Sequence, residues 1–195
     1  MLKDSFRRRS SGSGWLMLCV CWACFISMTD ALAQPLESAA YNKVQAAYIY
    51  KIANFVTWPD SELDSVFTIC IVEKSESLAV VLRQATSSRN IQKLPVKVLS
   101  FSLTQLETVS PDVRQCRLIY LHDQLESKTM DSLHSAAVED DPVLWISSPE
   151  VQADGSALFE LEVEGGRIVI YINRKRLSAS RLVVEAPLLS VARPR

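Results

Sequence analysis

The stretch from residue 44 to residue 60 has the hydrophobic pattern of an amphipathic helix. Polar side chains on its outer face include Lys51 and Asn54, and Gln45 is the one polar residue within the apolar arc. The side chains that share this apolar arc of a 3.6-residue helix are Val44, Tyr48, Ile49, Ile52, Phe55 and Val56. The pattern predicts a helix that buries one face against a core.

Pro59 is predicted to end this helix, which begins near Glu37 or Ser38. A proline ring removes a helical hydrogen bond and pushes the preceding residue towards an extended conformation. Trp58 therefore lies where the helix gives way to the next segment. We expect its indole to fill the core as an aromatic plug.

Short apolar segments rich in β-branched residues alternate with helical patterns through the middle of the chain. Continuous apolar character is typical of parallel strands that are covered on both faces. Helices are expected at 77–87 and 124–138, with a helical turn near 102–109. The expected strands are residues 66–72, 95–99, 117–121 and 142–146. Such alternation predicts an α/β sheet built from right-handed crossovers.

A β-hairpin is predicted after these units. Residues 157–163 alternate apolar and polar side chains, Gly165-Gly166 follow, and 167–172 are again apolar. Glycine supplies the positive φ that a tight turn requires. Asn173 is expected to cap a helix over 174–180, and 186–192 to form a last apolar turn. The predicted fold class is a single mixed α/β sheet with parallel βα units, a C-terminal antiparallel hairpin at one edge, and helices on both faces.

The first 33 residues have the organisation of a secretory signal peptide. Three arginines at 7–9 precede an apolar run at 15–28, and small residues end at Ala33, so cleavage is expected between Ala33 and Gln34. The apolar run is shorter than the roughly 20 residues of a spanning helix, which disfavours an uncleaved membrane anchor. A lipoprotein is disfavoured because bulky residues precede Cys19 and Cys24. We expect one domain over 34–195, exported to the periplasm.

Cleavage would remove four positive and two negative charges, which changes the formal net charge from −1 to −3. A mildly acidic domain lacks the basic surplus that non-specific nucleic-acid binding requires. Nucleic acid is therefore excluded as a partner.

Cys70 and Cys116 are the cysteines that remain after cleavage. An even pair in an oxidising compartment is most simply one disulfide. Closing a loop of this length gives about 4 kcal/mol in the chain-entropy model, as an upper figure. The alternatives are two separate buried thiols, or a bridge that acts as a redox switch.

No pattern in the sequence indicates catalysis, a cofactor or a metal site. His122 and His134 lie outside any metal-binding spacing and are expected at the surface, as is the acidic turn at 139–141. Gly165-Gly166 join two strands, whereas phosphate loops join a strand to a helix. Ser147 and Ser148 lack a neighbouring histidine in the sequence. The chain is predicted not to be an enzyme.

Several segments together resemble the YfiR-like periplasmic proteins, in order, from about Tyr41 to Ala192. The most specific are residues 55–59, FVTWP, and the hairpin and cap from Gly165 to Asn173. The segments that carry the resemblance are AAYIYKIANFVTWP, FTICIVE, CRLIYL, EGGRIVIYIN and SRLVVEAPLLSVA.

This resemblance implies a compact, non-enzymatic α/β regulator. Members hold an inner-membrane diguanylate cyclase inactive by binding its periplasmic portion, so that release raises cyclic di-GMP. The resemblance therefore implies that this chain reaches the membrane only through such a partner. Some respond to the redox state of their disulfides. This chain keeps cysteines at two of the family's positions, Cys70 and Cys116, and lacks the further pair that other relatives carry near the fourth strand. A homodimer is left open.

Many apolar side chains lie near the end of the chain, at Leu182, Val183, Val184, Leu188 and Leu189. A regulator without reactive groups needs an exposed apolar patch, and this segment and the first helix are where we expect one. The alternative is that these residues only cover the sheet. A module that captures a small molecule between sheet and helices is the second functional hypothesis.

Overall fold

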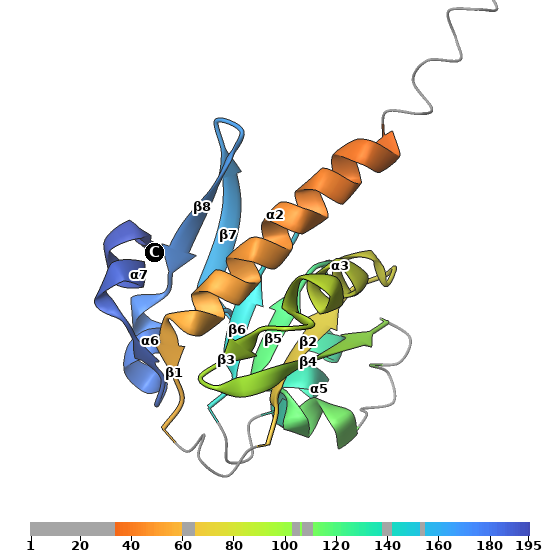
Figure 1. Ribbon diagram of the computed structural model, residues 1–195. Helices are drawn as coiled ribbons and strands as arrows, with labels where there is room; N and C mark the ends of the chain where they lie inside the picture. The colour runs from red at the N-terminus through yellow and green to blue at the C-terminus, as the bar shows by residue number, and fades with distance from the viewer. Residues whose placement is uncertain (1–33, 60–64, 103–105, 107–110, 138–141, 153–154) are drawn as a thin grey trace, which may run out of the picture. The chain divides into compact units, whose positions relative to one another are not determined.

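The computed structural model describes residues 34–59, 65–102, 106, 111–137, 142–152 and 155–195 (Figure 1). Tyr41–Arg195 form one compact unit. Helix α2 is Gln34–Asn54, and its residues from Tyr41 onward belong to this unit. None of the described helices combines the length and apolar character needed to cross a membrane.

Eight of the described strands form a mixed sheet in the order β10-β8-β7-β6-β5-β2-β4-β3 (Figure 1), and β1 and β9 form a separate two-stranded sheet. Strands β4, β2, β5, β6 and β7 run parallel, and β8 is antiparallel to β7. Their bounds are β2 Phe67–Val72, β3 Asn90–Ile91, β4 Leu94–Phe101, β5 Leu118–Leu121, β6 Leu144–Ser147, β7 Phe159–Glu164, β8 Arg167–Ile172 and β10 Arg193–Pro194. The predicted fold class is confirmed.

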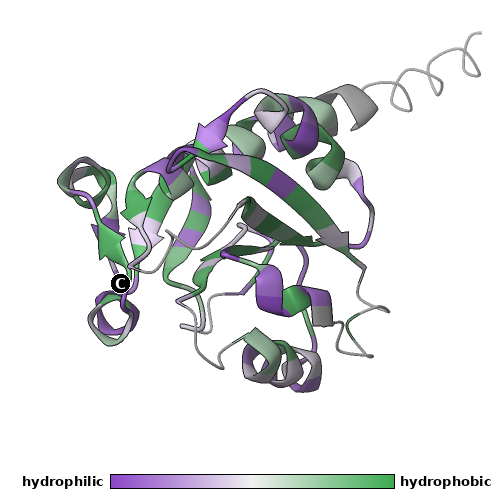
Figure 2. Cartoon of the chain, turned by 60° about the horizontal axis from the view of Figure 1, so that its bottom comes forward, coloured by the Kyte–Doolittle hydropathy of each residue, from purple (hydrophilic) through white to green (hydrophobic). Residues whose placement is uncertain are grey.

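Two hydrophobic cores lie on opposite faces of the sheet because side chains alternate along each strand. In β2, Phe67, Ile69 and Ile71 pack into the first core, with side chains of α2 and of α3, Ser77–Thr86. Cys70 and Val72 point into the second core. That core also holds side chains of α5, Ser127–Ala137, and of the 3-10 helix η3, Pro111–Gln115. In Figure 2 the strands are mostly hydrophobic, whereas the helices carry both kinds of residue.

The C-terminal hairpin and the helix that follows form as predicted. Gly165 and Gly166 have φ of 55° and 75°, which suits a two-residue turn between β7 and β8. Asn173 caps α6, Arg174–Ala179, because its Oδ1 accepts a hydrogen bond from Arg176 N at 3.1 Å. The last helix is α7, Ala186–Val191.

The prediction that Pro59 ends the first helix is wrong, because the helix already ends at Asn54. Strand β1, Val56–Thr57, follows and pairs antiparallel with β9, Val183–Val184. Glu185 N also donates to Phe55 O at 2.9 Å. The backbone here finds partners more than a hundred residues away, so it leaves the helical ladder early. Trp58 is buried as predicted.

The buried face of α2 is also rotated from the predicted one. Val44 is 44% exposed, whereas Gln45, expected to interrupt the apolar arc, is fully buried. Ile49 and Ile52 are buried as predicted, and Ala46 and Ala53 join them. Small side chains at the contact let a helix lie close to its neighbour, and a count of large apolar residues misses this.

Besides β1 and β9, two further short strands were not predicted. β3 forms a hairpin with β4. β10 pairs with β8, so the edge strand of the sheet next to the C-terminal hairpin is β10 and not a strand of the hairpin itself. Helix α5 begins at Ser127, three residues later than expected. Most of the predicted turn near 102–109, and the acidic residues 139–141, lie outside the described residues.

Candidate functional site

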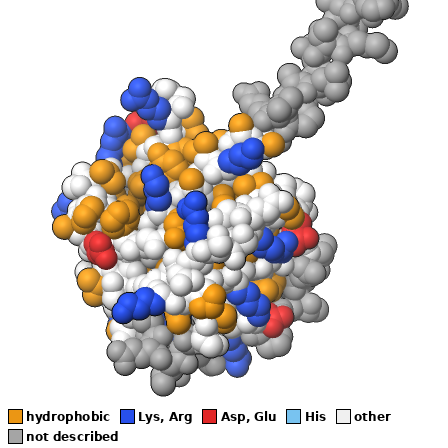
Figure 3. All heavy atoms as spheres, in the orientation of Figure 1, with side chains coloured by type: hydrophobic (Ala, Val, Ile, Leu, Met, Phe, Trp, Pro, Cys, Tyr) orange, Lys and Arg blue, Asp and Glu red, His pale blue; other side chains and the backbone are white. Residues whose placement is uncertain are grey.

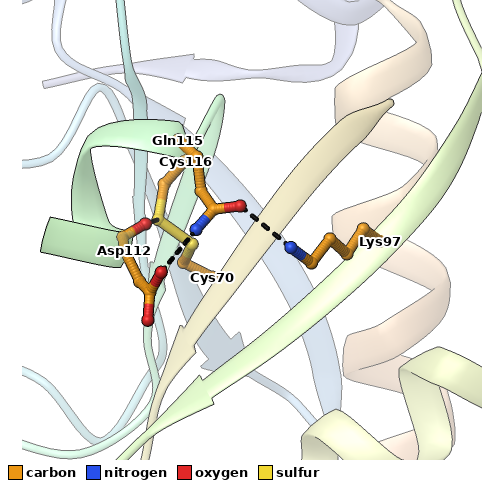
Figure 4. The surroundings of a disulfide bond; sticks show 5 residues. All are labelled: Cys70, Lys97, Asp112, Gln115 and Cys116. Carbon is orange, nitrogen blue, oxygen red and sulfur yellow. Dashed lines mark hydrogen bonds between the residues drawn. A yellow bond between two sulfur atoms is a disulfide. The ribbon is translucent and has the colours of Figure 1, made fainter. Parts of the chain in front are cut away.

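Cys70 and Cys116 form a disulfide, with their Cα atoms 5.8 Å apart (Figure 4). Cys70 lies within β2, and Cys116 precedes β5, the parallel strand beside it. Both cysteines are buried, at 1% and 3% exposure. The bridge therefore joins two central strands from within the second core.

A polar network lies beside the bridge on η3 (Figure 4). The Gln115 side chain accepts a hydrogen bond from Lys97 Nζ at 2.9 Å and donates one to Asp112 Oδ1 at 2.9 Å. Cys116 N donates to Val113 O at 3.1 Å. These contacts connect β4 to the turn that holds Cys116.

A buried carboxylate occupies the place where doubly wound sheets bind ligands. That place is at the carboxyl ends of the strands where the chain reverses direction, here between β2 and β5. Glu73, which follows β2, accepts hydrogen bonds from Leu78 N at 3.0 Å, Ala79 N at 3.1 Å and Ser100 Oγ at 3.2 Å. The first amides of α3, which would otherwise attract an anion, are taken by the chain's own carboxylate.

Sequence reasoning missed Glu73. The available signal was an acidic residue directly after a buried parallel strand and shortly before a helix. Beside it, Lys74 N donates to Asp123 Oδ2 at 2.7 Å and joins the ends of β2 and β5. This edge of the sheet is closed by internal hydrogen bonds.

The two histidines are half-buried, which corrects the prediction that both lie at the surface. His134 packs edge-on against Trp145, with ring centroids 4.3 Å apart, and His122 stacks near Tyr120 at 6.3 Å. Ser148 Oγ donates to the backbone oxygen of His122 at 2.7 Å, not to its imidazole. Among the described residues, His, Cys, Asp and Glu form no group of three that could hold a metal.

Tyr120 has a buried hydroxyl that finds no hydrogen-bond partner in the part of the chain that the structure describes. Burial raises its pKa well above the usual value, and the charges of Glu150 and Tyr41 add to this effect. Burial likewise raises the pKa of Tyr41. Both phenols therefore stay protonated at neutral pH, which leaves them unsuited to act as bases.

The five apolar residues singled out near the end of the chain divide into two groups. Leu182, Val184 and Leu188 are buried, at 5%, 8% and 4% exposure, and belong to the first core. Val183 and Leu189 are 61% and 41% exposed. Hydrophobic side chains gather over the region of α6 and α7 in Figure 3. A pocket of 430 Å³ lies there, lined by Ile172, Arg174, Leu177, Ser178, Leu189 and Ala192.

Residues 42–193 match the model of one protein family, described as YfiR/HmsC-like. The match covers well over half of the chain and includes both cysteines of the bridge, the hairpin and the C-terminal apolar segment. No curated protein matches this chain.

Proposed function

Since the chain belongs to the YfiR/HmsC-like family, we propose that it is a periplasmic regulator that binds the periplasmic part of an inner-membrane diguanylate cyclase and holds that enzyme inactive. The family match over residues 42–193 is the observation that carries the proposal. The site geometry is compatible with a regulator that acts by binding. Glu73 fills the place between β2 and β5 where sheets of this kind bind ligands, and the Ser148 hydroxyl donates to a backbone oxygen and not to a histidine side chain.

A regulator of this kind acts by binding one state of its partner more tightly than another. We assign the contact to the exposed apolar side chains Val183, Leu189 and Val191. Of these, Leu189 lines the pocket between α6 and α7. Leu182 and Leu188 support this surface from the core. An exposed apolar surface of this kind suits a protein partner.

The contact is tested by capture from detergent-solubilised membranes with the exported, tagged chain. The wild-type chain should retain a membrane protein with a diguanylate cyclase domain, identified by mass spectrometry. Val183→Asp with Leu189→Asp should lose it. Val80→Asp, at an exposed valine of α3, is the matched control and should retain it. Equal capture by all three chains would place the contact elsewhere.

We propose that export occurs through cleavage between Ala33 and Gln34, and that the bridge between Cys70 and Cys116 has a structural role. Burial of both cysteines supports the structural role, because exposed bridges are the ones that exchange readily. Intact-mass measurement of the exported protein, with and without reductant, tests both assignments. A mass that includes residues 1–33, or free thiols, would contradict them.

A small-molecule sensor is the second candidate, and the 430 Å³ pocket beside Leu189 favours it. A ligand at 100 times its dissociation constant should stabilise the fold by about 2.7 kcal/mol. A thermal-shift screen of the exported chain detects this. A compound that shifts the wild type and not a Leu177→Trp variant would identify the pocket as its site.

A further inference from the structure

The outer edge of β8 is covered by a very short strand from the same chain. β10 pairs in parallel with β8 only at Tyr171 and Ile172, and Arg195 N donates to Ile172 O at 3.0 Å. Further along this edge, the Tyr48 hydroxyl donates to Ile168 O at 3.2 Å. The outer edge of β8, a strand of six residues, is thus covered by the two residues of β10 and by the Tyr48 side chain. A sheet edge with so few contacts can pair with another strand.

An acidic stripe on β7 lies beside this edge. Glu160, Glu162 and Glu164 share one face of the strand because side chains repeat every second residue. Arg193 Nη1 lies 2.6 Å from Glu164 Oε2. Arg195 Nε lies 2.8 Å from Glu160 Oε2, and its Nη2 pairs with Glu162. Arg193 and Arg195, which are separated by one residue, therefore pair with glutamates that also lie at alternate positions of their strand.

Tyr171 completes a cradle for a guanidinium group. It stands opposite Glu160 in the register, and Arg195 Cζ lies 4.2 Å from the centroid of its ring. Its hydroxyl also donates to Glu164. Carboxylates that accept N–H groups, next to an aromatic face, are the features that favour arginine over lysine.

Glu160 needs a cation at this place. It is only 4% exposed, and an uncompensated buried charge is strongly destabilising. Arg193 meets Glu164 in an exposed ion pair, and such pairs contribute about 0–1 kcal/mol. The side chain of Arg195 is 36% exposed, although its partner Glu160 is buried. The cradle therefore requires a guanidinium, while β10, the segment that supplies it, pairs with β8 at only two residues.

Space for a longer occupant lies beside the cradle. A pocket of 380 Å³ has Glu160 and Glu162 on one wall and the loop after β6 on the other. Its lining residues are Ser147, Pro149, Val151, Gln152, Glu160, Leu161, Glu162 and Val163. Side chains of a strand that replaced β10 could enter it.

We propose that the β8 edge and the stripe Glu160–Glu162–Glu164 form a docking site for an extended segment of a partner protein that carries arginines at alternate positions. Arg193 and Arg195 occupy this site in cis and are displaced when the partner strand binds. The site adjoins the apolar surface around Leu189, because Ile172 pairs with Pro194 and also lines the pocket beside Leu189. The two assignments rest on different side chains, so either can fail without the other.

A fluorescent peptide of residues 190–195, SVARPR, serves as the probe, measured by anisotropy against the full exported chain. The double variant Arg193→Gln, Arg195→Gln lacks the competing cis arginines and should bind the peptide about tenfold more tightly than the wild type. Adding Glu160→Gln and Glu162→Gln to that variant should abolish binding, as should replacing both arginines of the peptide. Equal binding of the wild type and the double variant would overturn the proposal.

Amide exchange in the wild-type chain gives a second measurement that needs no variant. Peptide binding should accelerate exchange of the Arg195 amide, which is bonded to Ile172 O, because the cis segment leaves the edge. Unchanged exchange at saturating peptide would contradict displacement. A double variant that dimerises and excludes the peptide would assign the edge to a second copy of this chain, which also overturns the proposal.

Discussion

Two buried carboxylates at the ends of strands, Glu73 and Glu160, are satisfied in different ways. Glu73 is held by two backbone amides and a hydroxyl of its own domain, so it requires no other ion. Glu160 is held by the guanidinium of Arg195, a side chain that is 36% exposed. Carboxylates are seldom buried without a partner. Glu73 therefore fills a potential ligand site with internal hydrogen bonds. Glu160 depends instead on the side chain of Arg195, which another guanidinium could replace.

Replacing Glu73 with Gln should destabilise the fold by about 1–3 kcal/mol, because buried amides of α3 lose a charged acceptor. Glu76→Gln is the matched control, since Glu76 makes an exposed ion pair with Arg83 that contributes about 0–1 kcal/mol. Urea unfolding of both variants measures the difference. Equal midpoints would show that Glu73 contributes no more than a surface charge.

Acidification should loosen the contacts of Glu164. The Tyr171 hydroxyl, and after it Arg193, lower the pKa of this carboxyl below its ordinary value of 4.5. Because the folded pKa is the lower one, the stabilisation is present above pH 4.5 and is lost as the pH falls through the lowered pKa.

The wild type should therefore exceed Tyr171→Phe in unfolding free energy at pH 6, and the difference should shrink on acidification below pH 4.5. The phenylalanine keeps the ring beneath Arg195 and removes only the hydroxyl. Urea unfolding across this pH range measures the difference. A difference that stays constant with pH would contradict the assignment to Glu164.

At the scale of elements, the local pattern and distant contacts determine different features. The parallel strands were predictable because a strand covered on both faces is apolar throughout, as β2 is. The end of α2 was not, because β1 pairs with β9, which is remote in sequence. The β3–β4 turn has positive φ at Gln92 and Lys93, residues that are not typical turn signals. The site was predictable as far as the cysteine pair, but Glu73 and the arginine cradle depend on tertiary neighbours.

The hairpin turn should tolerate asparagine better than alanine at Gly165. The residue has φ of 55°, and an added Cβ would meet nothing within 4 Å, so only backbone strain is tested. Alanine in this conformation costs about 1–2 kcal/mol, whereas asparagine adopts it more readily. Thermal unfolding of the two variants should give the order wild type, Asn, Ala. An alanine variant as stable as the wild type would contradict the turn geometry.

The disulfide should matter for the stability of the whole sheet. Replacing Cys70 and Cys116 together by alanine should lower the free energy of unfolding by up to about 4 kcal/mol. The bridge should also resist dithiothreitol in the native protein and react readily in urea, since both cysteines are buried. Rapid reduction of the native protein, with little loss of stability, would favour the redox switch.

At the scale of the whole molecule, the C-terminal part of the chain presents two surfaces of different chemistry, one apolar and one a sheet edge beside acidic side chains. The apolar surface around Val183 and Leu189 is assigned to the cyclase, and the β8 edge to an arginine-bearing strand. Both act by binding. The family and the fold class followed from segments of the sequence. The match over 42–193 confirms the family, and the mixed sheet with its C-terminal hairpin confirms the fold class. Export and the partner stay predictions, because they concern residues or molecules outside the described chain.

The cellular level of cyclic di-GMP, measured by mass spectrometry, tests the regulatory function most directly. Deleting the gene should raise this level because the cyclase is released. The wild-type chain should restore it, whereas a chain with Val183→Asp and Leu189→Asp should not. An unchanged level of cyclic di-GMP in the deletion strain would contradict the proposed function.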